Sequence, residues 1–189
     1  RALWTPVLIA CFTLILSSAA HSEKPNVVVI MADDLGYSDI GCYGGEIDTP
    51  HLDSLAANGL RFSQFYNTAK CHSSRVSLLT GQYCIAAGEV SLSHAVTSAE
   101  VLRDAGYFTA MTGKWHLRRE PTDFGFDRYF GLLDGATSHF NPGHPRAGEP
   151  KPAQKLPGRR SWALDGEVVK PYTPPEARFY STDAYTERA

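Results

Sequence analysis

A continuous run of apolar, β-branched residues constrains the fold of this chain more than any other feature. Residues 26–31 read N-V-V-V-I-M and lie between Pro25 and Asp33, without the polar alternation of a strand that has one face in water. Such a run predicts a parallel strand covered on both faces by other elements. The acidic pair Asp33-Asp34 follows at the end of that strand, where open α/β sheets form their ligand crevice.

Capping and turn residues divide the following residues, up to 112, into alternating elements. Thr49 and Pro50 mark one helix start, and Thr97 with Glu100 has the spacing of a capping box at another. The predicted order is helix 50–58, strand 60–66, helix 73–80, helix 98–105 and strand 107–112. This alternation predicts an α/β fold with a mixed, largely parallel sheet flanked by helices.

The composition changes after Glu120. Several prolines between residues 121 and 157 stand among Gly, Lys and Arg, which predicts a long surface excursion with little core. Residues 161–170 predict a hairpin, because Asp165-Gly166 is a strong short turn signal between two apolar runs. Residues 179–189 predict the start of a helix.

The first twenty residues have the features of a signal peptide. Leu3 to Leu16 is almost wholly apolar and leads into the small residues Ser18-Ala19-Ala20, which suit signal peptidase. The run is broken by Pro6 and is shorter than the roughly 20 residues of a membrane span. We therefore expect a periplasmic or secreted protein with no stable membrane span. A lipoprotein site at Cys11 is the alternative.

Charge and cysteine content limit the partners and disulfides that we expect. The chain has 18 basic and 20 acidic residues, a formal net charge of -2. It therefore lacks the excess of basic residues that is typical of proteins that bind nucleic acids. Removal of residues 1–20 leaves Cys42, Cys71 and Cys84. In an oxidising compartment, an odd number leaves at least one thiol outside an intramolecular disulfide.

Two segments carry candidate chemistry. Asp33 and Asp34 could supply part of the oxygen shell of a hard divalent cation, although acidic pairs in loops are often only solvated. Cys71 precedes a predicted helix and Arg75 stands one turn later, an environment that suits an anion. A reactive thiolate and a buried structural cysteine both remain open for Cys71.

A third segment follows the strand predicted at 107–112. In Gly113-Lys114-Trp115-His116, strand alternation would point Lys114 and His116 to the same side of the backbone. A cation and an acid–base group would then face one site, or both residues would lie at the surface beside a packed Trp115.

The order of these segments gives a specific resemblance. The stretches P-N-V-V-V-I-M-A-D-D-L-G-Y-S-D, C-H-S-S-R-V-S-L-L-T-G and A-G-Y-F-T-A-M-T-G-K-W-H resemble those of the sulfatase family, in particular arylsulfatases, and the similarity spans residues 24–189. It implies an alkaline phosphatase-like sulfatase fold. Residues 24–189 would form the N-terminal part of the catalytic domain, incomplete at the C-terminus, with further metal ligands beyond Ala189.

The resemblance also implies a nucleophile and a metal. Cys71 stands where the family oxidises a cysteine to formylglycine, whose hydrate attacks sulfur in a covalent, two-step route. A formylglycine-generating enzyme or a sulfatase-maturing enzyme would be the partner that makes it. Asp33, Asp34 and the modified Cys71 would hold calcium, or magnesium in its place.

Other site residues are carried over in the same way. Arg75 matches the arginine that steadies formylglycine and its metal site, Lys114 the lysine that bridges to sulfate, and His116 the histidine bonded to the hydrate. Ser138-His139 matches a pair near the sulfate pocket of some arylsulfatases. The implied activity is hydrolysis of a sulfate ester on a small aryl molecule or a glycan.

Alternatives remain at this point. Phosphonate or phosphate diesters present a similar tetrahedral anion to the same scaffold, and a fold alone does not settle function. The chain departs from the modification motif at Ser73, where Pro or Ala normally stands. In a non-catalytic remnant, Cys71 would be unmodified and could pair with Cys42 or Cys84.

Overall fold

The computed structural model describes residues 24–144, 146–148, 160–175 and 178–189. The chain divides into two units, one ending at Asp33 and one formed by residues 34–189, and each is described by itself. The predicted signal peptide, residues 1–20, lies outside the described residues. Among the residues that are described, each helix is too short or too polar to cross a membrane.

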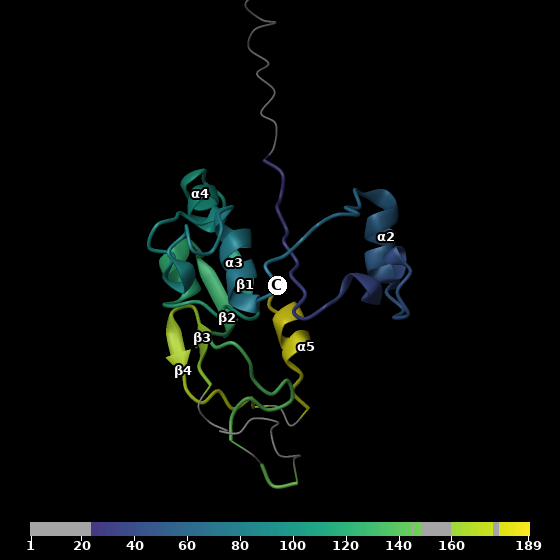
Figure 1. The fold of residues 1–189 in the computed structure, drawn as a ribbon. Helices are drawn as coiled ribbons and strands as arrows, with labels where there is room; N and C mark the ends of the chain where they lie inside the picture. Colours follow the sequence, from purple (N-terminus) through teal and green to yellow (C-terminus); the bar gives the residue numbers. More distant parts are fainter. Residues whose placement is uncertain (1–23, 145, 149–159, 176–177) are drawn as a thin grey trace, which may run out of the picture. The chain divides into compact units, whose positions relative to one another are not determined.

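A four-stranded sheet forms the centre of the second unit. Its strands are β1 (Ala110–Thr112), β2 (Arg128–Leu132), β3 (Trp162–Leu164) and β4 (Glu167–Val169), in that spatial order. β1 and β2 are parallel, whereas β2–β3 and β3–β4 are antiparallel. The predicted α/β fold with a mixed sheet is confirmed (Figure 1). The expectation of a largely parallel sheet is wrong for the described strands, because β1–β2 is parallel but the other two pairings are antiparallel.

Successive residues of β2 pack on opposite faces of this sheet. Tyr129 belongs to a core cluster with Val76 of α3 (Cys71–Thr80), and Phe130 belongs to a second cluster with Trp162. Ala184 and Tyr185 of α5 (Ser181–Thr186) pack against the second cluster. Because side chains alternate along a strand, the sheet is covered by α3 on one face and by α5 on the other.

The predicted helices form with small changes at their ends. The remaining helices are α2 (Pro50–Asn58), α4 (Ser98–Asp104), and the short 3₁₀ helices η1 (Tyr37–Asp39), η2 (Gly41–Tyr43), η3 (Glu89–Ser91) and η4 (Pro121–Phe124). The capping box at α4 is present: the Thr97 N–H donates to Glu100 Oε2 over 2.7 Å, and the Glu100 N–H donates to Thr97 Oγ1 over 3.1 Å. α3 begins at Cys71, two residues earlier than predicted.

The strands predicted at 26–31 and 60–66 are wrong for this structure. Both segments are outside any strand, and Val28 and Tyr66 are each more than 80% exposed. A strand requires ladder hydrogen bonds from a neighbour, and no described residue pairs with either segment. The strand predicted at 107–112 is shorter and begins at Ala110.

The prediction of a long surface excursion with little core after Glu120 is also wrong for residues 121–133. η4 and β2 lie there, and Phe124, Tyr129 and Phe130 are buried. The prolines after residue 120 led to the prediction of a loop where a tightly packed strand forms. A Cβ placed on Gly131 would lie 1.9 Å from the Gly113 carbonyl oxygen, so only glycine permits this approach of β2 to the segment that follows β1.

The predicted hairpin at Asp165-Gly166 is confirmed by β3 and β4, with positive φ at both turn residues. Asp165 Oδ2 accepts a hydrogen bond from Arg128 Nε over 2.8 Å, and Asp165 Oδ1 accepts one from the Tyr129 N–H over 3.0 Å. The Arg128 guanidinium, followed by the Tyr129 amide, holds the pKa of Asp165 below its usual range.

This arrangement predicts an acid-dependent loss of stability. Because the folded-state pKa is lowered, the contribution of Asp165 is present above the usual Asp pKa of about 4 and is lost as pH falls through the folded value. In the full-length protein, Asp165→Asn is expected to reduce the fall in urea midpoint between pH 7 and pH 3. Asn keeps the positive-φ turn. Asp104→Asn, at the exposed end of α4, is the control, and an equal effect of both changes would contradict the prediction.

Candidate active site

Cys71 is the first residue of α3, near the positive end of the helix dipole. The preceding loop is held by hydroxyl groups of the helix itself. The Thr68 Oγ1 lies 2.7 Å from Ser73 Oγ and 3.0 Å from Ser74 Oγ, and the Ser73 hydroxyl donates to the Lys70 carbonyl over 3.1 Å. Ser73, the residue that departs from the modification motif, therefore contributes to the local turn that presents Cys71.

Arg75 connects α3 to the segment after β1. Its side chain is buried, and its Nη1 donates to the Lys114 carbonyl oxygen over 2.5 Å, across 39 residues of sequence. α3 and the Gly113–His116 segment are thus joined by a guanidinium. The two motifs that the sequence placed far apart are brought together in the structure.

Residues 113–116 continue alongside β2 after β1 has ended. The Trp115 N–H donates to the Leu132 carbonyl over 2.8 Å, and the His116 N–H donates to the Leu133 carbonyl over 3.0 Å. Trp115 is fully buried, whereas Lys114 and His116 are half-buried. Because the consecutive N–H groups of Trp115 and His116 both donate to carbonyls on the β2 side, these residues do not continue a regular strand, and the prediction that Lys114 and His116 point to the same side stays a prediction. His116 has a φ of 61°, a conformation that non-glycine residues adopt uncommonly and that is enriched at functional sites.

His116 and His72 meet at an open pocket. Their ring centroids are 5.7 Å apart in an edge-on arrangement. The pocket has a volume of about 360 Å³ and is lined by His72, Val90, His116, Leu117, Arg118, Leu133, Asp134, Gly135 and Arg160. Two guanidinium groups and two imidazoles face one carboxylate across this space, so the pocket suits an anion.

Gly135 sets the position of the His116 ring. A Cβ at Gly135 would lie 2.3 Å from His116 Nε2, with other ring atoms also within 3 Å. The imidazole therefore packs directly against the glycine backbone, which no other residue type would allow without a shift.

Asp33 and Asp34 are both exposed, and the boundary between the two units falls between them. Within the described residues, no group of three or more His, Cys, Asp or Glu side chains could hold a metal ion. The carboxylate oxygens fit the donor chemistry of calcium or magnesium, but two residues are only part of a shell of about six to eight ligands. The assignment of this pair as metal ligands stays a prediction.

The Ser138-His139 pair has local structural contacts. Ser138 Oγ accepts from the Asn141 N–H over 3.2 Å, and His139 Nδ1 lies 2.7 Å from Ser181 Oγ at the start of α5. Neither residue lines the pocket that contains His72 and His116. Their role in substrate binding also stays a prediction.

Cys42, Cys71 and Cys84 are all free thiols in the structure, so Cys71 is not held in a disulfide with either of the others. The pocket residues that sequence reasoning missed are His72, Arg118, Asp134, Gly135 and Arg160. A signal existed for two of them, because His72 and Arg118 lie within two residues of predicted site residues.

A sulfatase family model matches residues 25–189 of the chain. The chain belongs to the sulfatase family. This sulfatase chain is 43% identical over 156 residues to an arylsulfatase of Klebsiella aerogenes, a match that covers 70% of the chain and 34% of the relative. It is 43% identical over 134 residues to arylsulfatase G of Rattus norvegicus, covering 62% of the chain and 25% of the relative. The chain thus spans between a quarter and about a third of the length of these relatives.

Solved structures give the same family at the level of the fold. The crystal structure of Ps i-CgsB superposes with a TM-score of 0.71 at 32% identity, covering 88% of the sulfatase chain and 40% of the solved one. The PsFucS1 sulfatase from Pseudoalteromonas sp. gives a TM-score of 0.57 at 34% identity, covering 71% and 31%. The predicted alkaline phosphatase-like sulfatase fold is therefore confirmed.

Proposed function

We propose that the full-length protein hydrolyses a sulfate ester of an aryl molecule or a carbohydrate. The observation that carries the proposal is the contact between α3 and the Gly113–His116 segment, made by the Arg75 hydrogen bond to Lys114 and by the packing of His72 on His116. This contact gathers motif residues around a cationic pocket in a chain of the sulfatase family.

Each side chain has a role that follows from its position. Cys71 is the site where a formylglycine-generating enzyme or a sulfatase-maturing enzyme acts, and the aldehyde, once made, supplies the hydrated group that takes the sulfuryl group. Asp33 and Asp34 would hold part of the shell of a calcium or magnesium ion, which would supply positive charge to neutralise sulfate. Arg75 fixes the backbone at Lys114, which keeps the lysine and His116 beside the nucleophile helix.

The substrate class and the cellular location belong to the same proposal. A solved relative, Ps i-CgsB, was crystallised with k-i-k-neocarrahexaose, and another structural relative is described as acting in glycosaminoglycan metabolism. These relatives support a sulfated glycan as the substrate. Residues 1–20 act as a signal peptide, so the enzyme works in the periplasm or outside the cell.

One comparison of substrates tests the activity. The full-length protein, matured in its native host, is expected to hydrolyse 4-nitrophenyl sulfate faster than bis(4-nitrophenyl) phosphate, measured as kcat/KM for each. If kcat/KM is higher for the phosphate diester, the proposal of a sulfatase is overturned and the protein is a phosphodiesterase. No rate on either ester would support the non-catalytic alternative.

The packing of Gly135 against His116 gives a second test. Gly135→Ala is expected to lower kcat on the aryl sulfate by about 10- to 100-fold, because the added Cβ displaces the imidazole from its working position. Ala136→Ser, at the exposed neighbouring residue, is the control. If Gly135 acts through His116, adding Gly135→Ala to His116→Ala lowers kcat little further. Additive losses would show that Gly135 acts elsewhere.

A further inference from the structure

We propose that Arg118 and Arg160 bind a second anionic group of the substrate, beside the ester that is hydrolysed. This inference rests on the proposed function and narrows its substrate class to glycans with more than one negative charge. Both arginines line the pocket that contains His72 and His116, and they reach it from different parts of the chain.

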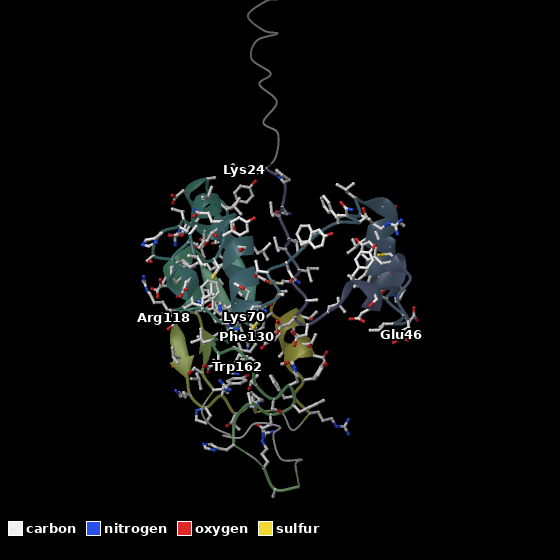
Figure 2. All side chains as sticks on the ribbon, in the orientation of Figure 1. Lys24, Glu46, Lys70, Arg118, Phe130 and Trp162 are labelled. Atoms are coloured by element: carbon white, nitrogen blue, oxygen red, sulfur yellow. The ribbon has the colours of Figure 1, made fainter. Side chains whose placement is uncertain are left out.

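Arg118 is held at the pocket by its backbone and keeps its side chain available. Its N–H donates to the Val90 carbonyl over 2.9 Å, and the residues on either side of Leu117 and Arg118, His116 and Arg119, have φ values of 61° and 59°. The side chain is exposed, and no described residue forms an ion pair with it (Figure 2). Two residues of chain span at most about 7 Å, so the Cα atoms of Arg118 and His116 lie no farther apart than that, and both residues line the pocket.

Arg160 lies at the pocket just before β3. Asp134 is its nearest acidic partner, with Nη1 and Oδ1 4.0 Å apart, at the limit of an ion pair. The other oxygen of Asp134 accepts from the Ser161 N–H over 2.6 Å, and the Leu133 N–H donates to the Ser161 carbonyl over 3.0 Å. Asp134 therefore fixes the backbone beside Arg160, and this long contact engages one end of a guanidinium that carries five N–H donors.

Size and charge favour an anionic group in addition to the reacting sulfate. The volume of about 360 Å³ falls at the low end of pockets that hold whole small molecules, which are roughly 300–1,000 Å³. Two guanidinium groups oppose only one carboxylate in the lining. Guanidinium groups bind sulfate-like and carboxylate oxygens through paired, charge-assisted hydrogen bonds, which suits a second sulfate or a uronate carboxylate.

The test uses matched sugars and neutral, similarly sized substitutions in the matured full-length protein. The probes are a disaccharide with one sulfate, the same disaccharide with two, and a monosulfated disaccharide that contains a uronate. Arg118→Gln and Arg160→Gln are each expected to lower the ratio of kcat/KM for a doubly charged probe to that for the singly charged one by about tenfold, mainly through KM. Arg119→Gln is the control, because that neighbour pairs with Asp123 at 3.1 Å and does not line the pocket.

The outcomes separate this inference from the proposed function. A changed ratio with either doubly charged probe supports the subsite and identifies the second group as sulfate or carboxylate. Hydrolysis with an unchanged ratio for both probes overturns the subsite and leaves the sulfatase activity standing. If no probe is hydrolysed, calorimetric binding of the disulfated disaccharide decides: binding that Arg118→Gln weakens about tenfold supports the subsite, and binding that it leaves unchanged, or no binding, overturns it.

Discussion

Replacing Cys71 by alanine in the full-length protein is expected to lower kcat on 4-nitrophenyl sulfate by on the order of 10⁴-fold or more. Loss of a covalent nucleophile removes the reaction route itself, and such losses are among the largest that single substitutions produce. Cys71 is the first residue of α3 and is half-buried, so alanine is tolerated by the helix. Steady-state rates of the two proteins, purified in parallel, measure the effect.

The control is Cys42→Ala, because Cys42 is also a half-buried free thiol but belongs to η2 and not to α3. The kcat of Cys42→Ala is expected to match that of the protein without a substitution. Mass analysis of the peptide that contains Cys71, from protein made in the native host, is expected to give the mass of formylglycine. A free thiol or a disulfide at Cys71, with full activity, would contradict both the nucleophile and the maturation step.

Arg75→Met is expected to lower the free energy of unfolding by about 2–3 kcal/mol and kcat by about 100-fold. The substitution removes a charged, buried donor and leaves the part-buried Lys114 carbonyl without its guanidinium partner. The Gly113–His116 segment then loses its tie to α3, and displacements of about 1 Å at a reacting site can cost a factor of this size. Urea unfolding and steady-state kinetics of the full-length protein measure the two effects.

Arg61→Met is the matched control for Arg75→Met. Arg61 Nη1 donates to the Cys42 carbonyl, also over 2.5 Å, but this guanidinium–carbonyl pair is exposed. Water can replace the lost donor there, so we expect a change in the free energy of unfolding below about 0.5 kcal/mol. Equal effects of the two substitutions would mean that burial of the Arg75 bond contributes nothing, and an unchanged kcat in Arg75→Met would contradict its role in holding the segment.

Local signals predicted the elements that local interactions stabilise. The capping box of Thr97 and Glu100 starts α4, and the Asp165-Gly166 turn joins β3 and β4, because the determining contacts lie within a few residues. β2 was not predicted from the sequence. It forms a strand because it pairs with β1 and β3 and because Gly131 can approach Gly113 closely. The strand predicted at 26–31 had the right composition but has no described pairing partner.

Some residues of the candidate site were predicted from the sequence and others were not. Residue types and their order made Cys71, Arg75, Lys114 and His116 candidates, because each chemical role requires a particular side chain at a particular place beside a strand or helix. The lining contributed by Asp134, Gly135 and Arg160 was not predicted. These residues come from the loop after β2 and the segment before β3, and nothing in their own sequence marks them as neighbours of His116.

The sequence by itself determined the family and the α/β class and supplied the candidate reactive side chains, because these depend on residue chemistry and short-range spacing. Only the tertiary structure decided that Arg75 ties α3 to Lys114, that Gly135 seats His116, and that two arginines flank the same pocket. The physical reason is sequence separation. Contacts across 39 residues, as between Arg75 and Lys114, depend on how strands pair and cores pack, which local propensity does not encode.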